Sequence, residues 1–340
     1  MTDIWNRLKG NDKPVLLYGS GDGAEKIFNE LCRRNIKISG VFAGDGFKKN
    51  RKFKDYNIIT FSEAVRIFGN FTGLFAFGSN SDEVIGGVKK MMQTVEISVA
   101  EMPVCGNKPF DIDFARQNAE KLKKVYNLLA DEQSKKVFEQ TVLFKLDGNI
   151  NRLFNCETDE DEAFNNILKL EKGNSFLDLG AYNGDTVLDF VGRVGEYSYI
   201  TAVEPDIKTF KKLENNTKHL KVEKINSAVS DKCGEIPFSF KSSRGSAFGG
   251  DDKISAVTID SLNKKFDYIK FDVEGEELKA IIGGKNLICK TKPKMLVSCY
   301  HRIEDYFEIP LKVLEIRPDY KVYMRHFKYI PAWDTNFYFV

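Results

Sequence analysis

A short apolar run, a glycine-rich turn and a helical pattern constrain the fold of this 340-residue chain more than any other feature. The run 176–179 has the length and composition of a buried parallel strand. After the turn, apolar residues recur at the spacing of one helical face, at Val187, Phe190, Val191 and Val194. A strand, a glycine turn and a helix in this order open the nucleotide-binding half of a doubly wound α/β sheet.

The turn itself indicates which kind of ligand to expect. Gly180 lets the backbone approach a ligand where a side chain would collide. The spacing Gly180-x-x-x-Gly184 differs from the dinucleotide fingerprint G-x-G-x-x-G. Asp178 stands on the strand just before the turn, and a carboxylate there suits a cationic ligand better than a pyrophosphate. S-adenosylmethionine carries an amino group and a sulfonium, so we expect this cofactor.

The next strand, residues 199–203, ends in a second acidic residue, Glu204. An acidic side chain at the end of the second strand is where ribose hydroxyls are held. Each acid alone would fit a structural role, Asp178 as a helix cap and Glu204 as a solvated turn residue. Together and in this order with the two glycines, they favour a cofactor site. Ser227 and Ala228, at the end of the third strand, could meet an adenine edge.

Bulk composition limits the class of protein. A chain of this length exceeds one typical core and suggests two domains. Lys and Arg number 51 against 49 Asp and Glu, so there is no electrostatic footprint for nucleic acid. The polar start lacks a signal core and no apolar run could span a bilayer, which predicts a cytoplasmic protein without membrane insertion. Six cysteines without a C-x-x-C pair argue against a thiolate metal site or a disulfide framework.

Residues 1–105 alternate between strand and helix patterns, which predicts a small Rossmann-like α/β domain. Gly19-x-Gly21-x-x-Ala24 fits the relaxed dinucleotide fingerprint, and Asp45 ends the second strand where it could hold a ribose. An equally good interpretation is a tight turn that caps a helix and binds nothing. Any ligand here should be a nucleotide or nucleotide-sugar, because no hydride-transfer constellation follows. Ser62 is the expected N-cap of a later helix.

Residues 106–172 are charged and helical in pattern, with amphipathic helices expected over 113–129 and 131–145. Such a helical connector joins domains or makes homodimer contacts. The Ser- and Gly-rich stretch 242–250 could be an active-site lid or a surface loop. Strand patterns at 320–327 and 336–340 predict a terminal hairpin in a domain that spans 173–340.

Three polar residues follow strands of this second domain, Asp272, Glu274 and His301. Ligands of an open α/β sheet bind outside the carboxyl ends of its strands, so the three form a candidate catalytic centre. His301 is the first choice as proton acceptor, because its ordinary pKa lies near neutrality, and Asp272 is the second. The same oxygen-rich set could hold Mg²⁺, although one His with two carboxylates is too common to assign a metal site.

Six short motifs in order resemble the FkbM family of methyltransferases over roughly half of the chain. They are LDLGAYNGDT at 177–186, VEPD at 203–206, AVSD at 228–231, TID at 258–260, IKFDVEGEE at 269–277 and PKML at 293–296. The resemblance implies a Rossmann-like, S-adenosylmethionine-dependent O-methyltransferase with a seven-stranded, mostly parallel sheet that ends in an antiparallel hairpin. The cofactor-binding residues that we predict are Asp178, Gly180, Ala181, Tyr182, Asn183, Gly184, Asp185, Thr186, Glu204, Pro205, Ser227 and Ala228.

The resemblance also implies a class of acceptor, since such enzymes serve polyketide, glycolipid and surface-polysaccharide pathways. We therefore expect methylation of a sugar hydroxyl on a capsule, lipopolysaccharide or other glycan precursor, free or nucleotide-linked. The N-terminal domain is similar to nucleotide-binding-like domains of bacterial sugar-modifying enzymes. Two other classes stay open: a non-catalytic module that binds a nucleotide or nucleotide-sugar, and an NAD(P)-dependent oxidoreductase built on Gly19-Ser20-Gly21.

Overall fold

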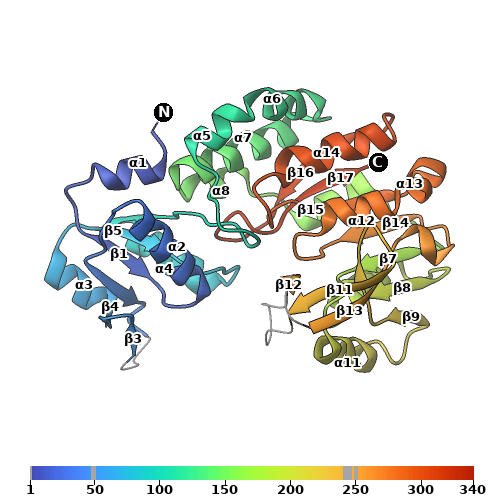
Figure 1. Cartoon of the computed structure of the whole chain (residues 1–340), viewed down its shortest axis with the longest axis horizontal. Helices are drawn as coiled ribbons and strands as arrows, with labels where there is room; N and C mark the ends of the chain where they lie inside the picture. The colour runs from blue at the N-terminus through green and yellow to red at the C-terminus, as the bar shows by residue number, and fades with distance from the viewer. Residues whose placement is uncertain (1, 47–50, 240–246, 249–251) are drawn as a thin grey trace. The chain divides into compact units, whose positions relative to one another are not determined.

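The computed structural model describes residues 2–46, 51–239, 247–248 and 252–340, so most of the expected lid at 242–250 lies outside the described residues. The chain forms two compact units (Figure 1). Unit 1 comprises Met1–Tyr126, Glu132–Thr158 and His326–Thr335, and unit 2 comprises Asn127–Asp131, Asp159–Arg325 and Asn336–Val340. The residues of the expected connector are divided between both units. None of the helices in the described ranges is long and apolar enough to cross a membrane.

Unit 1 is built on a six-stranded sheet in the order β3-β4-β2-β1-β5-β6. Its strands pair in parallel except for the short antiparallel pair β3–β4. The strands are β1 Val15–Tyr18, β2 Gly40–Ala43, β3 Lys52–Phe53, β4 Tyr56–Thr60, β5 Thr72–Phe75 and β6 Glu96–Ser98. The helices up to residue 156 are α1 Ile4–Lys9, α2 Asp22–Arg33, α3 Phe61–Phe68, α4 Asp82–Met91, α5 Ile112–Gln117, α6 Ala119–Leu128, α7 Glu132–Asp147 and α8 Asn151–Cys156.

Alternate residues of β1 enter two different cores, because successive side chains of a strand point to opposite faces. Leu16 packs with buried residues of α3, α4 and α8. Leu17 packs with buried residues of α1 and α2. The sheet of unit 1 is therefore covered by helices on both faces. Ile330, from near the C-terminus, completes the first of these cores.

Helix boundaries in this part of the chain differ from the sequence-based expectation at two places. The N-cap of α3 is Thr60 rather than Ser62, because Thr60 and Glu63 form a reciprocal capping box. The helix expected over 113–129 is two helices, α5 and α6, with Asn118 as the C-cap of α5.

Unit 2 contains a seven-stranded sheet in the order β16-β17-β15-β14-β7-β8-β9. Strands β15, β14, β7, β8 and β9 pair in parallel, and β17 pairs antiparallel to β15. The predicted mostly parallel sheet with a terminal antiparallel hairpin, beside a smaller N-terminal α/β unit, is thus confirmed. The strands are β7 Phe176–Leu179, β8 Ile200–Val203, β9 Val222–Ile225, β14 Tyr268–Phe271, β15 Lys294–Ser298, β16 Val322–His326 and β17 Thr335–Phe339.

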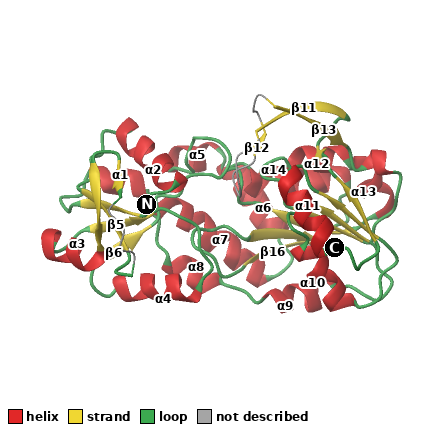
Figure 2. Ribbon diagram, turned by 90° about the horizontal axis from the view of Figure 1, so that it is seen from below, coloured by secondary structure: helices red, strands yellow, loops and turns green. Residues whose placement is uncertain are grey.

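Helices flank both faces of this sheet, with α12 and α13 along one side of the strands and α10 along the other (Figure 2). The helices from residue 160 onward are α9 Glu160–Glu162, a π-helix Ala163–Leu168, α10 Asp185–Val194, α11 Ile207–Asn216, a 3₁₀ turn Asp260–Leu262, α12 Glu277–Gly283, α13 Lys285–Thr291 and α14 Asp305–Ile316. A second, four-stranded sheet joins β10 Ala228–Val229, β13 Asp252–Val257, β11 Gly234–Ser239 and β12 Ala247–Phe248 in that order.

Candidate active site

The carboxyl ends of four neighbouring strands, β15, β14, β7 and β8, gather the predicted polar residues at one edge of the sheet of unit 2. Gly180 makes the meeting of β7 and β14 possible. Its φ is +79°, and a Cβ there would overlap the backbone carbonyl oxygen of Asp272. Gly184, at φ +87°, starts α10 where a Cβ would lie 2.9 Å from side-chain atoms of Leu213 and Thr217. Both glycines are therefore required by close packing within the protein itself.

The turn between β7 and α10 is held by its own polar groups. The N–H of Tyr182 donates to Oε2 of Glu204 over 2.9 Å, with Tyr182 at φ +45°. Asn183 accepts from the N–H of Asp185, and Asp185 accepts from the N–H of Thr186. Ala181 in this turn is buried. Tyr182 remains 38% exposed, so this aromatic residue offers an apolar surface next to the turn.

Glu204 is a largely buried carboxylate fixed from both sides. Its Oε1 accepts the N–H of Asp206 over 2.8 Å while Oε2 accepts that of Tyr182. Burial raises the pKa of Glu204 to about 7 against these two donors. The carbonyl oxygens of Glu204 and Pro205 accept from the side-chain amide of Asn226. The second and third strand ends are therefore tied together beside the turn.

The two residues predicted to meet an adenine edge are both buried. Ser227 donates its hydroxyl proton to the carbonyl oxygen of Ser255 over 2.7 Å, and Ala228 pairs with Ala256 as the first residue of β10. The Ser227 hydroxyl therefore donates to the four-stranded sheet and not to a ligand. At residues 227 and 228, the backbone is the part of the chain that could contact an adenine edge.

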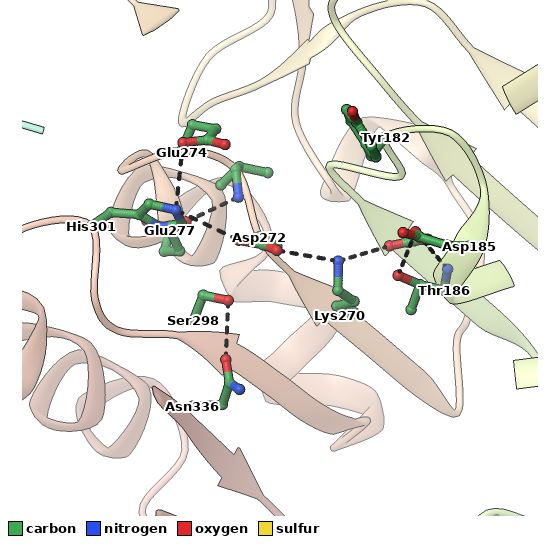
Figure 3. A network of polar contacts seen from close by, with 12 residues as sticks. Tyr182, Asp185, Thr186, Lys270, Asp272, Glu274, Glu277, Ser298, His301 and Asn336 are labelled. Atoms are coloured by element: carbon green, nitrogen blue, oxygen red, sulfur yellow. Dashed lines mark hydrogen bonds and ion pairs between the residues drawn. The ribbon is translucent and has the colours of Figure 1, made fainter. Parts of the chain in front are cut away.

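Asp178 is fully buried, and neither of its carboxylate oxygens accepts a hydrogen bond from the described part of the chain. Burial raises the pKa of Asp178 to about 6, and the nearby ammonium of Lys270 opposes that rise. Lys270 Nζ lies 3.6 Å from Oδ1 of Asp178. It also lies 3.6 Å from Oδ2 of Asp272 (Figure 3). One lysine thus lies between the strand-end carboxylates of β7 and β14.

The predicted catalytic residues Asp272, Glu274 and His301 do come together (Figure 3). His301 Nε2 lies 3.6 Å from Oδ1 of Asp272 and 3.6 Å from Oε2 of Glu274. The hydroxyl of Tyr300 donates to Oδ1 of Asp272 over 3.1 Å. His301 is 1% exposed, whereas the side chains of Asp272 and Glu274 are 30% and 46% exposed. The two carboxylates therefore face the opening, and the imidazole lies behind them.

Glu277 is a site residue that the sequence analysis did not assign. Its Oε1 lies 2.9 Å from His301 Nδ1 and accepts the backbone N–H groups of Val273, over 2.9 Å, and Gly275, over 3.4 Å. The turn that it ties down is left-handed, with Glu274 at φ +52° and Gly275 at φ +90°. The only signal of this turn in the sequence is the run Glu274-Gly275-Glu276-Glu277. The inward role of Glu277 could not be predicted from it, because an acidic residue at the start of a helix ordinarily faces solvent.

The charged side chains around His301 shift one another's pKa values. Burial lowers the pKa of His301, but Glu277, Asp272 and Glu274 outweigh it and raise that pKa to about 10. For Asp272, burial is outweighed by Lys270 and His301, and the pKa lies below its usual value. For Glu274, burial dominates and raises the pKa. At neutral pH, His301 is therefore an imidazolium that faces the carboxyl groups of Asp272 and Glu274.

Among the residues that the structure describes, Asp272, Glu277 and His301 form a group compact enough for a metal ion, with ligand atoms within 4.8 Å of one another. The Nδ1 of His301 is turned to Glu277, so Nε2 is the ring nitrogen that faces Asp272 and Glu274.

The glycine turn of unit 1 is shaped by close packing. Gly19, at φ +113°, lies where a Cβ would be 2.8 Å from the ring of Phe77, and a Cβ on Gly23 would overlap the carbonyl oxygen of Ala76. Asp45, expected to hold a ribose, accepts from the N–H and the hydroxyl of Ser62, each over 2.8 Å. Both oxygens of Asp45 are thus engaged at the start of α3.

Comparison with known proteins adds one family and one closely similar fold. The family model described as Methyltransferase FkbM domain matches residues 178–329. The crystal structure of Methyltransferase FkbM from Methylobacillus flagellatus KT is similar with a TM-score of 0.77 and 20% identity, over 99% of this chain and 92% of that chain. The precorrin-6y C5,15-methyltransferase of Geobacter metallireducens GS-15 has a TM-score of 0.33 and 13% identity, over 51% and 81%, too low to support an argument. No match was found among proteins with curated descriptions.

Proposed function

Residues 178–329 are a methyltransferase domain of the FkbM family, and from this premise we propose that the protein transfers a methyl group from S-adenosylmethionine to a sugar hydroxyl. The proposed acceptor is a precursor of a bacterial surface polysaccharide, lipopolysaccharide or related glycan, free or nucleotide-linked, and the proposed place of action is the cytoplasm. The motif resemblance supports this class of acceptor. The near balance of 51 basic and 49 acidic side chains argues against a nucleic-acid substrate.

The observation that carries the choice of cofactor is the buried carboxyl group of Asp178, whose oxygens accept no hydrogen bond in the described part of the chain. Buried polar groups are nearly always hydrogen-bonded, so this group is suited to a donor from a ligand. A cationic cofactor satisfies it and favours its ionised form. The pyrophosphate of a dinucleotide would meet like charge there, which favours S-adenosylmethionine over NAD(P).

Glu204 supports the same cofactor from the neighbouring strand end. Each of its oxygens accepts one backbone N–H and keeps a second lone pair for a ribose hydroxyl. The turn from β7 to α10 lies near both Asp178 and Glu204. It contains Tyr182 and Asn183, and α10 begins with Asp185 and Thr186. The residues therefore fit a nucleoside with a cationic tail.

When bound, S-adenosylmethionine supplies a methyl carbon that is already activated by a sulfonium. In the proposed transfer the acceptor oxygen would form the new C–O bond as the C–S bond breaks, the bonding pair would stay on sulfur, and the hydroxyl proton would pass to a base. The protein must align the acceptor and exclude water, and positioning alone is worth roughly 7–11 kcal/mol. A placed base adds roughly 10²–10⁴-fold.

We propose Glu274 as that base, with His301 as the cation behind it. On the sequence alone His301 is the first choice, but its pKa of about 10 makes the imidazolium its resting form. The side chain of Glu274 is 46% exposed, and its partial burial raises its pKa, which makes it a stronger base than an ordinary glutamate. Asp272, held by Tyr300 and by Lys270, then orients the acceptor hydroxyl.

The same opening offers the ligands of a divalent cation: two carboxylates, Asp272 and Glu274, and one imidazole nitrogen of His301. A bound Mg²⁺ would acidify the acceptor hydroxyl and reduce the need for a base. Methyl transfer measured after chelation with EDTA decides between catalysis by Glu274 as a base and catalysis by a bound metal ion. Activity that survives chelation supports Glu274 as the base, and activity restored only by Mg²⁺ assigns the three side chains to a metal.

Calorimetric titration with S-adenosylmethionine, S-adenosylhomocysteine and NADPH in parallel tests the cofactor. We expect micromolar binding of the first two, weakened at least tenfold in D178N and E204Q. E223Q is the matched control, because Glu223 is an acid of the same sheet that pairs with Lys264 on the surface. Binding of NADPH without S-adenosylmethionine would contradict the proposal and favour an oxidoreductase.

A second assay tests the acceptor. The protein and S-adenosylmethionine are incubated with a panel of sugars, nucleotide-sugars and oligosaccharides, and with phenols and small peptides as non-sugar acceptors. We expect S-adenosylhomocysteine release and a methyl ether on a sugar. Turnover on the non-sugar acceptors alone would contradict the sugar assignment while leaving the methyltransferase intact.

A further inference from the structure

Lys270 occupies a position that methyl transfer by itself does not explain. It belongs to β14 and is the direct cross-strand partner of Asp178 on β7. Its side chain is 13% exposed, and its ammonium lies 3.6 Å from Asp178 Oδ1 and 3.6 Å from Asp272 Oδ2. The lysine is therefore equidistant from the carboxylate assigned to the cofactor and the carboxylate assigned to the acceptor.

Neither of these distances is that of a charge-assisted hydrogen bond, which is about 2.7–2.9 Å. The ammonium is thus shared between two acids and not fixed on either. Any movement that shortens its distance to one carboxylate weakens its pairing with the other. A third acid, Asp185, also acts on Lys270 from the β7–α10 turn, but one of its oxygens accepts the N–H of Thr186.

A second cation near Asp178 changes this balance, because like charges repel strongly where water is excluded. We propose that Lys270 couples the two halves of the active site: a cationic cofactor at Asp178 drives the lysine charge towards Asp272, and loss of the Asp272 charge lets Lys270 hold Asp178 against the cofactor. The inference rests on the proposed function for the identity of the cofactor.

Coupling of this kind is reciprocal, since each ligand state changes the other by the same free energy. Cofactor binding then strengthens the pairing of Lys270 with Asp272, beside the proposed base. Lys270 is in this view a positioning residue, which acts on the reacting groups through the two carboxylates.

The test is a calorimetric cycle on the full chain with S-adenosylmethionine as the probe. We expect D272N to weaken binding about fivefold or more, because Lys270 is then released to Asp178. E274Q is the matched control, since Glu274 pairs with His301 whereas Asp272 pairs with both His301 and Lys270, and it should change the affinity less than twofold. In a K270M background, D272N should also change the affinity less than twofold.

Three results would overturn the coupling. They are a D272N chain that binds as tightly as the wild type, an E274Q chain that weakens as much as D272N, and a D272N effect of equal size with and without Lys270. K270Q replaces K270M if the methionine variant does not fold, and the D272N and E274Q arms need no change at Lys270. If the wild type itself does not bind S-adenosylmethionine, the proposed function fails, which is a different outcome from a failed cycle.

Discussion

At the scale of single residues, one oxygen atom of Glu277 holds both a strained turn and an imidazole. Its Oε1 accepts from Val273 and Gly275 and lies 2.9 Å from His301 Nδ1. The carboxylate also outweighs burial in setting the charge of His301, together with Asp272 and Glu274. Glu277 therefore fixes which ring nitrogen of His301 faces Asp272 and Glu274, and it extends the pH range over which the ring stays protonated.

E277Q should separate these two roles. The glutamine oxygen can still accept the backbone donors but carries no charge, so we expect the pKa of His301 to fall from about 10 by roughly 1–3 units. The measurement is a nuclear magnetic resonance titration of the ring, alongside the pH profile of kcat, whose high-pH limb should move down with it.

His326 is an internal control for E277Q, because the chain has three histidines and this one is buried in unit 1. Its hydrogen-bond partner is Thr335 and not a carboxylate. Its signal should be the same in the variant and in the wild type. An unchanged titration of His301 in a folded E277Q chain would show that Glu277 does not set the charge.

Cofactor affinity should depend on pH through Asp178 and Glu204. Burial raises both pKa values, to about 6 and about 7, so the protonated forms persist closer to neutrality than in a free side chain. Their ionised forms attract a cation and accept ribose hydroxyls. We expect the Kd for S-adenosylmethionine to fall about tenfold between roughly pH 5.5 and 7.5, because a one-unit shift corresponds to about 1.4 kcal/mol.

The stability of the free protein should change in the opposite direction. A raised carboxyl pKa means that the folded state binds the proton more tightly than the unfolded state, so stability falls as pH rises from the unfolded pKa towards the folded one. Bound cofactor should reverse this loss. A flat affinity over the same range, or an E204Q chain with the slope of the wild type, would contradict these assignments.

At the scale of elements, the contact between β7 and β14 depends on Gly180. A Cβ would overlap the carbonyl oxygen of Asp272, and φ is +79°, a region that side chains disfavour. We expect G180A to lose several kcal/mol of unfolding free energy, as other backbone clashes in a core do, and to lose cofactor binding. The measurement is unfolding in denaturant.

Gly192 provides the matched glycine in the helix that follows. It lies inside α10, where a Cβ would have no atom within 4 Å apart from its chain neighbours and the helix's own backbone, and its φ is not positive. G192A should therefore be neutral or stabilise the protein by roughly 0.5–1 kcal/mol, the helix preference of alanine over glycine. Equal stability of G180A and G192A would show that the strand ends do not need the glycine.

The sequence predicts the central strands well because they are short apolar runs buried on both faces. β7 and β8 lie where the runs 176–179 and 199–203 place them, and β14 and β15 are apolar runs of the same kind. Two strands of unit 1 are not apolar runs of this kind: β3, which has two residues, and β6, which begins with the charged Glu96. Such edge strands are defined by their pairing with a neighbour, and periodicity carries little signal for them.

The site divides in the same way. Asp178, Glu204, Asp272 and His301 could be placed from sequence, because the rule that ligands bind at strand carboxyl ends needs only the order of strands. The roles of Lys270 and Glu277 depend instead on the cross-strand register and on a left-handed turn. These are tertiary features that local patterns do not determine.

At the scale of the whole molecule, the chain returns from unit 2 to unit 1 before it ends. Residues 326–335, between β16 and β17, belong to unit 1 although the strands on either side lie mainly in unit 2. Ile330 exchanges both backbone hydrogen bonds with Ser79 and is buried in the unit 1 core. A Cβ on Gly78 would overlap the Trp333 ring. The sequence predicts the hairpin but not this return, since no local pattern says which core a loop joins.

I330A should consequently weaken unit 1 and spare the cofactor site. Truncation of a buried isoleucine costs roughly 2–5 kcal/mol, and every predicted cofactor residue lies in unit 2. The two tryptophans, Trp5 and Trp333, are both in unit 1, so tryptophan fluorescence in denaturant reports the unfolding of that unit. We expect its midpoint to fall while the affinity for S-adenosylmethionine stays within twofold.

I67A is the control, because Ile67 lies on α3 of the same unit and is 57% exposed, and a surface truncation usually changes stability by less than about 0.5 kcal/mol. If I330A unfolds at the wild-type midpoint, the returning segment does not contribute to the core of unit 1. If its cofactor affinity falls together with the midpoint, the two units do not fold and bind independently.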